Sequence, residues 1–269
     1  ARGIVDKYWR AVTLMAVADH LPVNEAKESF TEALVAARGI DDERQRVGAL
    51  SELAERLPAN EAPEVLAEAL TTARRIDDER WHAIALSRVA TRLPAEQGWM
   101  LISEALTKTL RINEEGLRAE ALCAVVRPIP IDARDLLDKV LTDARGMKSA
   151  FGRANALCAV AGRLPDDETR EVLTEALAAL HNIKESFLRV SPLGRIARVL
   201  PAYAPKLLAE MLVEAQALDP DDYLAFLVDR SVPLFYRLDV ARRTILPLRR
   251  MRHRVTDILV STPVIRDRF

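Results

Sequence analysis

Two acidic triplets are the residues of this chain whose types and spacing come nearest to a metal site. Asp41-Asp42-Glu43 and Asp77-Asp78-Glu79 stand 36 residues apart, and neighbouring carboxylates can coordinate Mg²⁺. A DDxxD motif needs an aspartate at its fifth position, where this chain has Gln45 and Trp81. Acidic side chains also cap the free N–H groups at a helix start and favour its positive end. The repetition at a fixed interval therefore predicts helix N-termini, and we expect no metal.

Histidine and cysteine offer no pattern for zinc binding or covalent catalysis. The four histidines are scattered along the chain, without HxxxH or HExxH spacing. Cys123 and Cys158 occupy the same position of two similar stretches, ALCAVV and ALCAVA, and this position elsewhere holds Met15, Ser51, Ser87 or Gly194. A position that tolerates such different, mostly small residues predicts packing rather than a nucleophile.

Motifs for nucleotide binding and for acyl transfer are missing from the sequence. None of GxxxxGK[ST], GxGxxG or GxSxG occurs, so the chain lacks a glycine loop for phosphates and a nucleophile elbow. The sequence therefore predicts a protein that is not an enzyme and binds no cofactor.

Composition points to helices. The chain has 269 residues, of which 49% are hydrophobic and only 5% aromatic. Alanine, leucine, arginine and glutamate favour helices, whereas the β-branched and aromatic residues that favour strands are sparse. Two cysteines, no secretory leader and no long apolar run predict a cytoplasmic protein without a membrane segment.

A repeated Leu-Pro or Ile-Pro step divides the chain into units of 35 or 36 residues. Proline lacks an N–H group and disfavours helix in the residue before it, so each step marks a helix end and a turn. The steps end at Pro22, Pro58, Pro94, Pro130, Pro165 and Pro201.

Each unit contains two stretches with helical spacing of apolar residues, for example 62–76 and 77–94. We therefore predict an all-α fold, an α-solenoid of helix-turn-helix repeats. Five full units follow a leading half unit and form a solenoid over residues 1–218. Residues 219–269 have lost the small-residue positions and are predicted to form a degenerate, basic helical cap.

The repeat resembles the tetratricopeptide (TPR) and HEAT classes of helical repeat. Its consensus, LxEALxxARxIxDExxRAxALxxLAxRLP, is most similar to the Ala/Leu-rich arrays appended to bacterial signalling NTPases and caspase-like defence proteins. The resemblance covers roughly residues 1–220 and implies a sensor or scaffold segment within a larger protein. Because the chain begins in the middle of a repeat, we expect it to be a piece of such a protein.

One face of the second helices is predicted to bind a partner. With about 100° per residue, the face opposite the core-facing Leu86 carries Trp81, Ile84, Arg88 and Arg92. Tryptophan beside arginine is common at interaction hot spots. A tryptophan in this position could equally fill the groove between two units. Equivalent positions in other units add three residues, namely Trp9, Arg56 and Arg163.

The first helices carry a complementary acidic line. It runs through Glu32, Glu68, Glu104, Glu175 and Glu210, with Lys139 as the one exception. Such a line is expected to be solvated or paired with basic residues of the same chain.

The C-terminal region is strongly basic although the whole chain has a net charge of −1. Residues 230–269 contain ten arginines against three aspartates. The densest part, LRRMRHRV at 248–255, is called the basic segment below. It could dock on its own solenoid or a neighbouring domain, bind an acidic protein, or contact nucleic acid. Its anion-binding candidates are Arg249, Arg250, Arg252 and Arg254.

Two functions are compatible with these features. The favoured one is a non-catalytic protein-interaction scaffold or sensor module, whose partner is another protein or a neighbouring domain. The alternative is a nucleic-acid-binding helical repeat that uses the basic segment against phosphates, with an affinity that falls steeply with salt.

Overall fold

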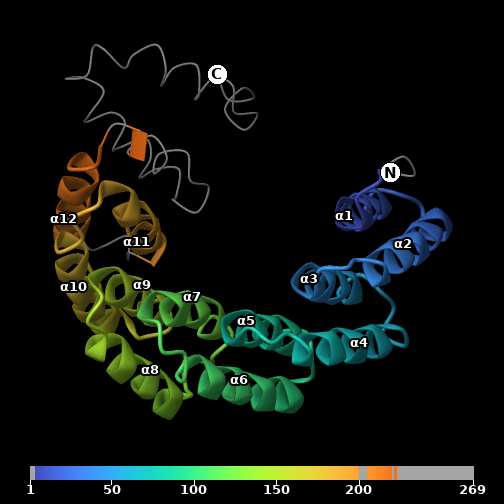
Figure 1. The fold of residues 1–269 in the computed structure, drawn as a ribbon, viewed down its shortest axis with the longest axis horizontal. Helices are drawn as coiled ribbons and strands as arrows, with labels where there is room; N and C mark the ends of the chain where they lie inside the picture. Colours follow the sequence, from blue (N-terminus) through green and yellow to red (C-terminus); the bar gives the residue numbers. More distant parts are fainter. Residues whose placement is uncertain (1–3, 200–204, 220, 223–269) are drawn as a thin grey trace. The chain divides into compact units, whose positions relative to one another are not determined.

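The computed structural model describes residues 4–199, 205–219 and 221–222. These residues form twelve helices and no strand, so the all-α prediction is confirmed for them (Figure 1). The helices are α1 (Lys7–Ala18), α2 (Val23–Arg38), α3 (Glu43–Ala54), α4 (Ala62–Arg74), α5 (Glu79–Ala90), α6 (Ala95–Thr109), α7 (Glu115–Val125), α8 (Arg134–Gly146), α9 (Ala150–Ala161), α10 (Asp166–His181), α11 (Ser186–Val199) and α12 (Pro205–Gln216).

The chain divides into two compact units, residues 1–136 and 137–269. The boundary falls in the first turn of α8, and each unit is described by itself. The cap predicted for residues 219–269 lies almost entirely outside the described residues, so its boundary at residue 218 stays a prediction.

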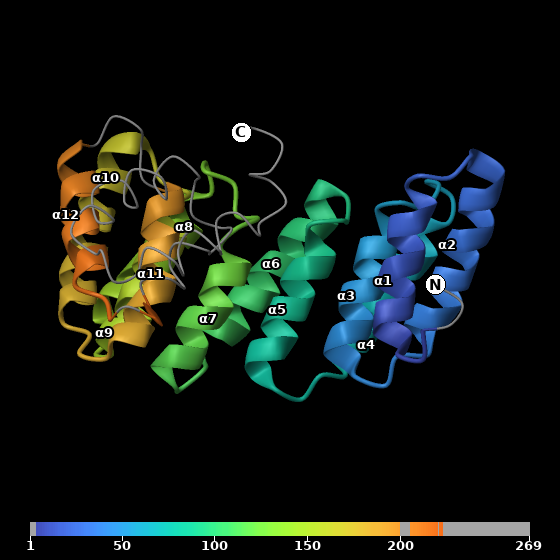
Figure 2. The same cartoon turned by 90° about the horizontal axis from the view of Figure 1, so that it is seen from above.

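The first unit has two layers of helices. Helices α1, α3, α5 and α7 lie side by side, each in contact with the next, and α2, α4 and α6 cover one side of them (Figures 1 and 2). The most extensive contacts join the helices on either side of a Leu-Pro step, such as α5 with α6. The proline turn thus sets the closest helix pair, and the first layer leaves its other side uncovered within this unit.

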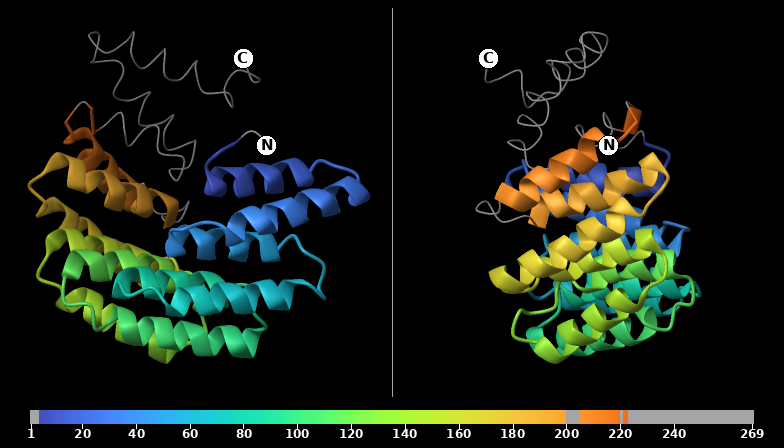
Figure 3. Two further views of the ribbon diagram at one scale, coloured as in Figure 1. Left: turned by 45° about the vertical axis from the view of Figure 1, so that its right-hand side comes forward. Right: turned by 90° about the vertical axis from the view of Figure 1, so that its left-hand side faces the viewer.

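The second unit is built around α9. This helix packs against both α10 and α11, and α12 contacts α10 and α11 in turn (Figure 3). Pro192 lies buried inside α11. The same helix-turn-helix succession therefore continues after residue 137.

The acidic triplets cap helices, as predicted. Asp42 precedes α3 and accepts a hydrogen bond from the backbone N–H of Gln45 at 3.0 Å. Asp78 does the same for Trp81 at the start of α5, at 2.9 Å. Each carboxylate satisfies an N–H group that the helix leaves without a partner.

Among the described residues each Leu-Pro or Ile-Pro step lies between two helices, as predicted. Pro22, Pro94 and Pro165 directly precede α2, α6 and α10. A proline before the first helical turn costs nothing, because the N–H that it lacks would have no intrahelical partner there.

The core is made of leucine and alanine. Leu50, Leu86 and Leu122 are fully buried at equivalent positions of α3, α5 and α7, and Ala83 and Ala119 are buried beside them. Alanine lets helices approach closely because it has no side chain beyond Cβ.

The position shared by the two cysteines is a packing position in both units. Cys123 and Cys158 are buried, as are Ser51 and Ser87. The hydroxyl of Ser87 donates a hydrogen bond to the carbonyl of Ala124 at 3.1 Å. These side chains therefore face the following helix of the same layer, which explains why they are small.

A repeated basic side chain ties consecutive helices together, and this device was not predicted. In the first turn of α7 the guanidinium of Arg118 donates to the carbonyl of Ile112, which follows α6, at 2.6 Å. The ring of His82 lies 3.1 Å from the carbonyl of Ile76 in the same arrangement. Arg153 and Arg189 donate to the equivalent carbonyls of their own repeats. Arg46 donates to the carbonyl one residue later, that of Asp41, at 3.2 Å.

Candidate functional site

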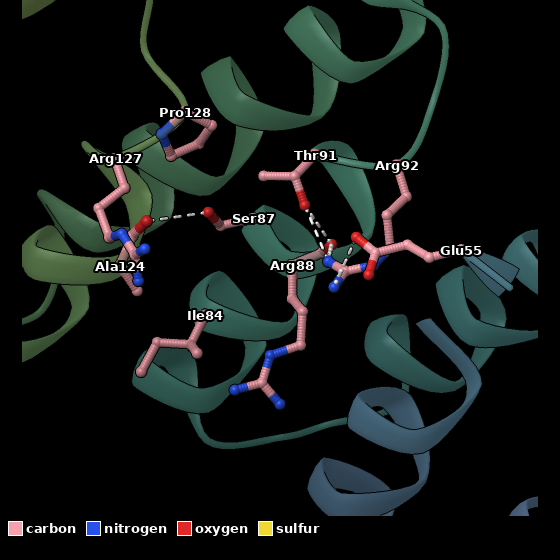
Figure 4. Close-up of a pocket in the computed structure, with 9 residues that line it drawn as sticks. All are labelled: Glu55, Ile84, Ser87, Arg88, Thr91, Arg92, Ala124, Arg127 and Pro128. Atoms are coloured by element: carbon pink, nitrogen blue, oxygen red, sulfur yellow. Dashed lines mark hydrogen bonds and ion pairs between the residues drawn. The ribbon is translucent and has the colours of Figure 1, made fainter. Parts of the chain in front are cut away.

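The uncovered side of the first layer contains two adjoining hollows. The larger, about 430 Å³, lies between α3, α5 and α7 and is called the arginine groove (Figure 4). The smaller, about 240 Å³, lies between α1, α3 and α5 and is called the tryptophan pocket. Ile84 and Arg88 line both hollows. They therefore form one continuous feature of the first unit.

Trp81 forms one wall of the tryptophan pocket. The indole is half-buried, and the guanidinium carbons of Arg80 and Arg44 lie 4.6 Å and 5.2 Å from a ring centroid. Cation–π contacts of this kind hold an aromatic ring in place. The ring thus contributes both to the contact between α3 and α5 and to the wall of the hollow.

The charge of Arg44 is balanced locally by Asp42. The Arg44 guanidinium beside Asp42, together with the N–H of Gln45, lowers the pKa of that carboxyl to about 2. The same contact raises the pKa of Arg44. Arg80 is likewise balanced, because its guanidinium lies 2.7 Å from a carboxylate oxygen of Glu120.

Arg92 is held within the chain rather than presented to a partner. Its guanidinium lies 3.1 Å from a Glu55 carboxylate oxygen and donates to the carbonyl of Arg88 and to the hydroxyl of Thr91, at 2.8 and 2.9 Å (Figure 4). Arg56, its equivalent one unit earlier, contacts Asp19 at 3.2 Å. Both arginines join neighbouring helices of the layer.

Two arginines of the groove have no such balance. Arg88 and Arg127 are exposed, and neither has a hydrogen bond or ion pair from its guanidinium among the described residues. Figure 4 shows the Arg88 side chain directed away from the Arg92–Glu55 pair. Gly48 leaves room for it, since a Cβ there would lie 2.8 Å from Arg88 Nη1. The groove therefore carries uncompensated positive charge.

Two aromatic residues of α1 differ in their relation to this feature. Trp9 is 60% exposed and packs edge-to-face against Tyr8, with ring centroids 5.4 Å apart. Tyr8 lines the tryptophan pocket, whereas Trp9 lines neither hollow. Of the two tryptophans predicted to bind a partner, the structure brings only Trp81 to the hollows.

Arg56, like Trp9, lines neither hollow. Arg163 belongs to the second unit and is half-buried there. The four arginines of the basic segment lie outside the described residues.

Sequence reasoning missed Arg127, Gly48 and Tyr8. The sequence does contain a signal for Arg127. Pro128 stands at the position that Arg92 has one repeat earlier, and Arg127 directly precedes it. For Gly48 and Tyr8 no pattern in the sequence indicates proximity to Arg88 or Trp81, since the contacts depend on how the helices pack.

The acidic line of the first helices is used for internal ion pairs. In the first unit Arg38 contacts Glu68 at 2.9 Å, and in the second Arg145 contacts Glu175 at 2.6 Å. This agrees with the expectation that these acids pair with basic residues of the same chain.

Comparison with protein-family models, with curated proteins and with solved structures finds no match for this chain. Within the described part of the chain, no helix is long and apolar enough to cross a membrane. The same residues contain no cluster of three or more histidine, cysteine or acidic side chains placed to hold a metal ion.

Proposed function

We propose that this chain is a non-catalytic protein-interaction module, a scaffold or sensor segment that grips a partner through the uncovered side of α3, α5 and α7. The observation that carries the proposal is the pair of adjoining hollows, which combine the half-buried Trp81, the half-buried Ile84 and two exposed arginines, Arg88 and Arg127, without an ion-pair partner among the described residues. Aromatic, aliphatic and arginine side chains around a hollow are the composition of binding hot spots.

The repeat architecture supports this proposal. In our interpretation the helix pairs form an α-solenoid, in which equivalent positions of successive units build a long face. Asp6, Asp42 and Asp78 cap successive helices of the first layer in the same way. A regular layer with one side uncovered supplies a stable surface on which a few deviating residues can define a binding site.

The resemblance to repeat arrays of bacterial signalling and defence proteins adds a setting for the proposal. In that setting the module recognises a partner protein, or another domain of its own polypeptide, and a neighbouring domain carries any catalytic activity. No step in the proposal needs a cofactor or a metal.

A charge placed in the shared wall of both hollows tests the proposal. Ile84→Glu puts a carboxylate into the arginine groove and the tryptophan pocket at an incompletely buried position. Met100→Glu is the matched control, since Met100 is 70% exposed on α6, outside both hollows. Both variants should keep the helical circular dichroism of the wild type.

The measurement is quantitative capture of partners from a lysate of the source cells, followed by photo-crosslinking from residue 84 or 100. We expect wild type and Met100→Glu to capture the same proteins, Ile84→Glu to lose them, and crosslinks to form only from residue 84. Equal capture by the two variants would remove this side of the first layer from consideration.

A further inference from the structure

The chemistry of the arginine groove specifies the kind of partner that it fits. We propose that the groove binds an acidic peptide segment, with its carboxylates on Arg88 and Arg127 and an apolar side chain against Ile84. The inference rests on the proposed function, because it names the partner of the same face.

The first argument is that two of the three arginines lining the groove lack a carboxylate partner, whereas the third, Arg92, has one. Within the described residues of the first unit, Arg92, Arg56 and Arg80 all lie within ion-pair distance of a carboxylate. Arg88 and Arg127 line the same groove and have none. A hydrated guanidinium facing a hollow is available for a carboxylate, which it can bind through two parallel hydrogen bonds.

The second argument is that the fold does not require these two arginines. One unit before and one unit after Arg88, the chain has Glu52 and Ala124, and one unit before Arg127 it has Thr91. All of these residues lie in the regular layer. Since acidic, small and polar residues serve the architecture equally well, the positive charge belongs to this groove rather than to the repeat.

The third argument is that the fold makes room for Arg88. Gly48 faces the Arg88 guanidinium, and any larger residue would bring a Cβ within 2.8 Å of its Nη1. The equivalent positions of the two neighbouring repeats hold Val12 and Ile84. A glycine is therefore present in the one unit where an arginine of the next helix lies over α3.

A peptide fits the groove better than a nucleic acid. A nucleic-acid strand presents a charge at every nucleotide and is usually bound along a track of cations. Glu55 lines the groove, and Glu120 pairs with the neighbouring Arg80. Their carboxylates would repel the phosphates of such a strand. Isolated carboxylates separated by apolar residues can meet Arg88 and Arg127 without approaching these acids.

The test is selection of random 12-residue peptides displayed on phage against the wild-type chain. The same selection is made on Arg88→Gln/Arg127→Gln and on Arg111→Gln/Arg170→Gln, a control that removes the same charge. Arg111 and Arg170 are exposed and have no side-chain partner among the described residues. Circular dichroism and the thermal midpoint verify that all three proteins fold alike.

We expect the wild type and the control to enrich peptides with net negative charge and at least one large apolar residue, and the groove variant to lose them. For synthetic copies of the enriched peptides, fluorescence anisotropy should show binding about 25-fold weaker on the groove variant, with about fivefold for each exposed arginine contact. Affinity should also fall as salt rises from 50 to 300 mM.

Three outcomes would overturn parts of this reasoning and can be told apart. Enriched peptides that are neutral or basic, or that bind the groove variant equally well, refute the acidic peptide and leave the interaction module intact. No enrichment on the wild type refutes the proposed function itself. A labelled single-stranded oligonucleotide that binds the wild type and not the groove variant replaces the peptide with a nucleic acid.

Discussion

Replacing Arg153 with methionine tests whether the repeated basic side chain stabilises the fold. Arg153 lies in the first turn of α9, and its Nη1 donates to the carbonyl of Met147 at 2.6 Å. That carbonyl directly follows the end of α8. Methionine retains the apolar stem of arginine and removes only the charged donor.

The magnitude follows from this geometry. A hydrogen bond from a charged group contributes about 1.5–3 kcal/mol, and the lower value applies because Arg153 is only half-buried. We therefore expect a loss of about 1.5 kcal/mol in the free energy of unfolding. In a chain of this size that corresponds to a thermal midpoint lower by about 3–6 °C. Urea titration followed by circular dichroism at 222 nm measures the loss directly.

The control is Arg170→Met, at an exposed arginine of α10 with no side-chain partner among the described residues. It should change the free energy of unfolding by less than about 0.5 kcal/mol. A converse test is His82→Arg, which should stabilise the first unit because arginine reaches the Ile76 carbonyl in the manner seen at Arg118. If Arg153→Met and Arg170→Met lowered the free energy of unfolding equally, the repeated contact would not contribute to stability.

Three further predictions concern a cap, a close helix contact and the basic segment. Asp42→Asn keeps the N-cap but removes a carboxylate whose pKa is lowered from 3.8 to about 2. Since a lowered pKa stabilises the fold above pH 4, the free energy of unfolding of the wild type at pH 7 should exceed that of the variant by about 1 kcal/mol, after allowance for solvent screening. Urea titrations should show this difference vanish as the pH falls from 4 to 2. Gly98→Ala places a Cβ 2.5 Å from the Ala90 carbonyl oxygen, so thermal unfolding should show a net loss of about 1 kcal/mol in the free energy of unfolding despite the better helix propensity. The control Gly146→Ala, whose added Cβ would have nothing within 4 Å, should leave the stability unchanged or raise it. Single-stranded or duplex DNA should not bind near 50 mM salt; binding that falls steeply with salt and disappears when glutamine replaces the four arginines of the basic segment would favour the nucleic-acid alternative.

The elements of the fold could be predicted because local rules determine them. The capping role of Asp42 and Asp78 depends on hydrogen bonds to N–H groups three residues away. The helix starts after Pro22 and Pro94 depend on the missing N–H of proline. Interactions of this range are visible in a few consecutive letters and recur in several repeats, so the sequence predicts them without any knowledge of packing.

The site could be predicted only in part, because its chemistry depends on neighbours from other helices. A helical projection correctly directs Arg88 and Arg92 away from the core, but it does not tell that Glu55, 37 residues earlier, binds Arg92 and not Arg88. The same limit hid Gly48, whose role depends on an arginine of the next helix in the layer. Direction along one helix is a property of the sequence, whereas pairing between helices is a property of packing.

A repeat chain nevertheless supplies its own controls, and they separate residues of the fold from residues of the site. The position that ties consecutive helices is arginine or histidine in five successive repeats, from Arg46 to Arg189, because it contacts a backbone carbonyl in the turn between two helices. The position of Ile84, in contrast, holds Val12, Gly48 and Glu120 in the other units of the first layer. Val12 packs against the core and Glu120 pairs with Arg80, so this position takes apolar, small and charged residues in different repeats. Positions that deviate from a regular repeat on one uncovered face are therefore the better guide to function than the repeated motif itself.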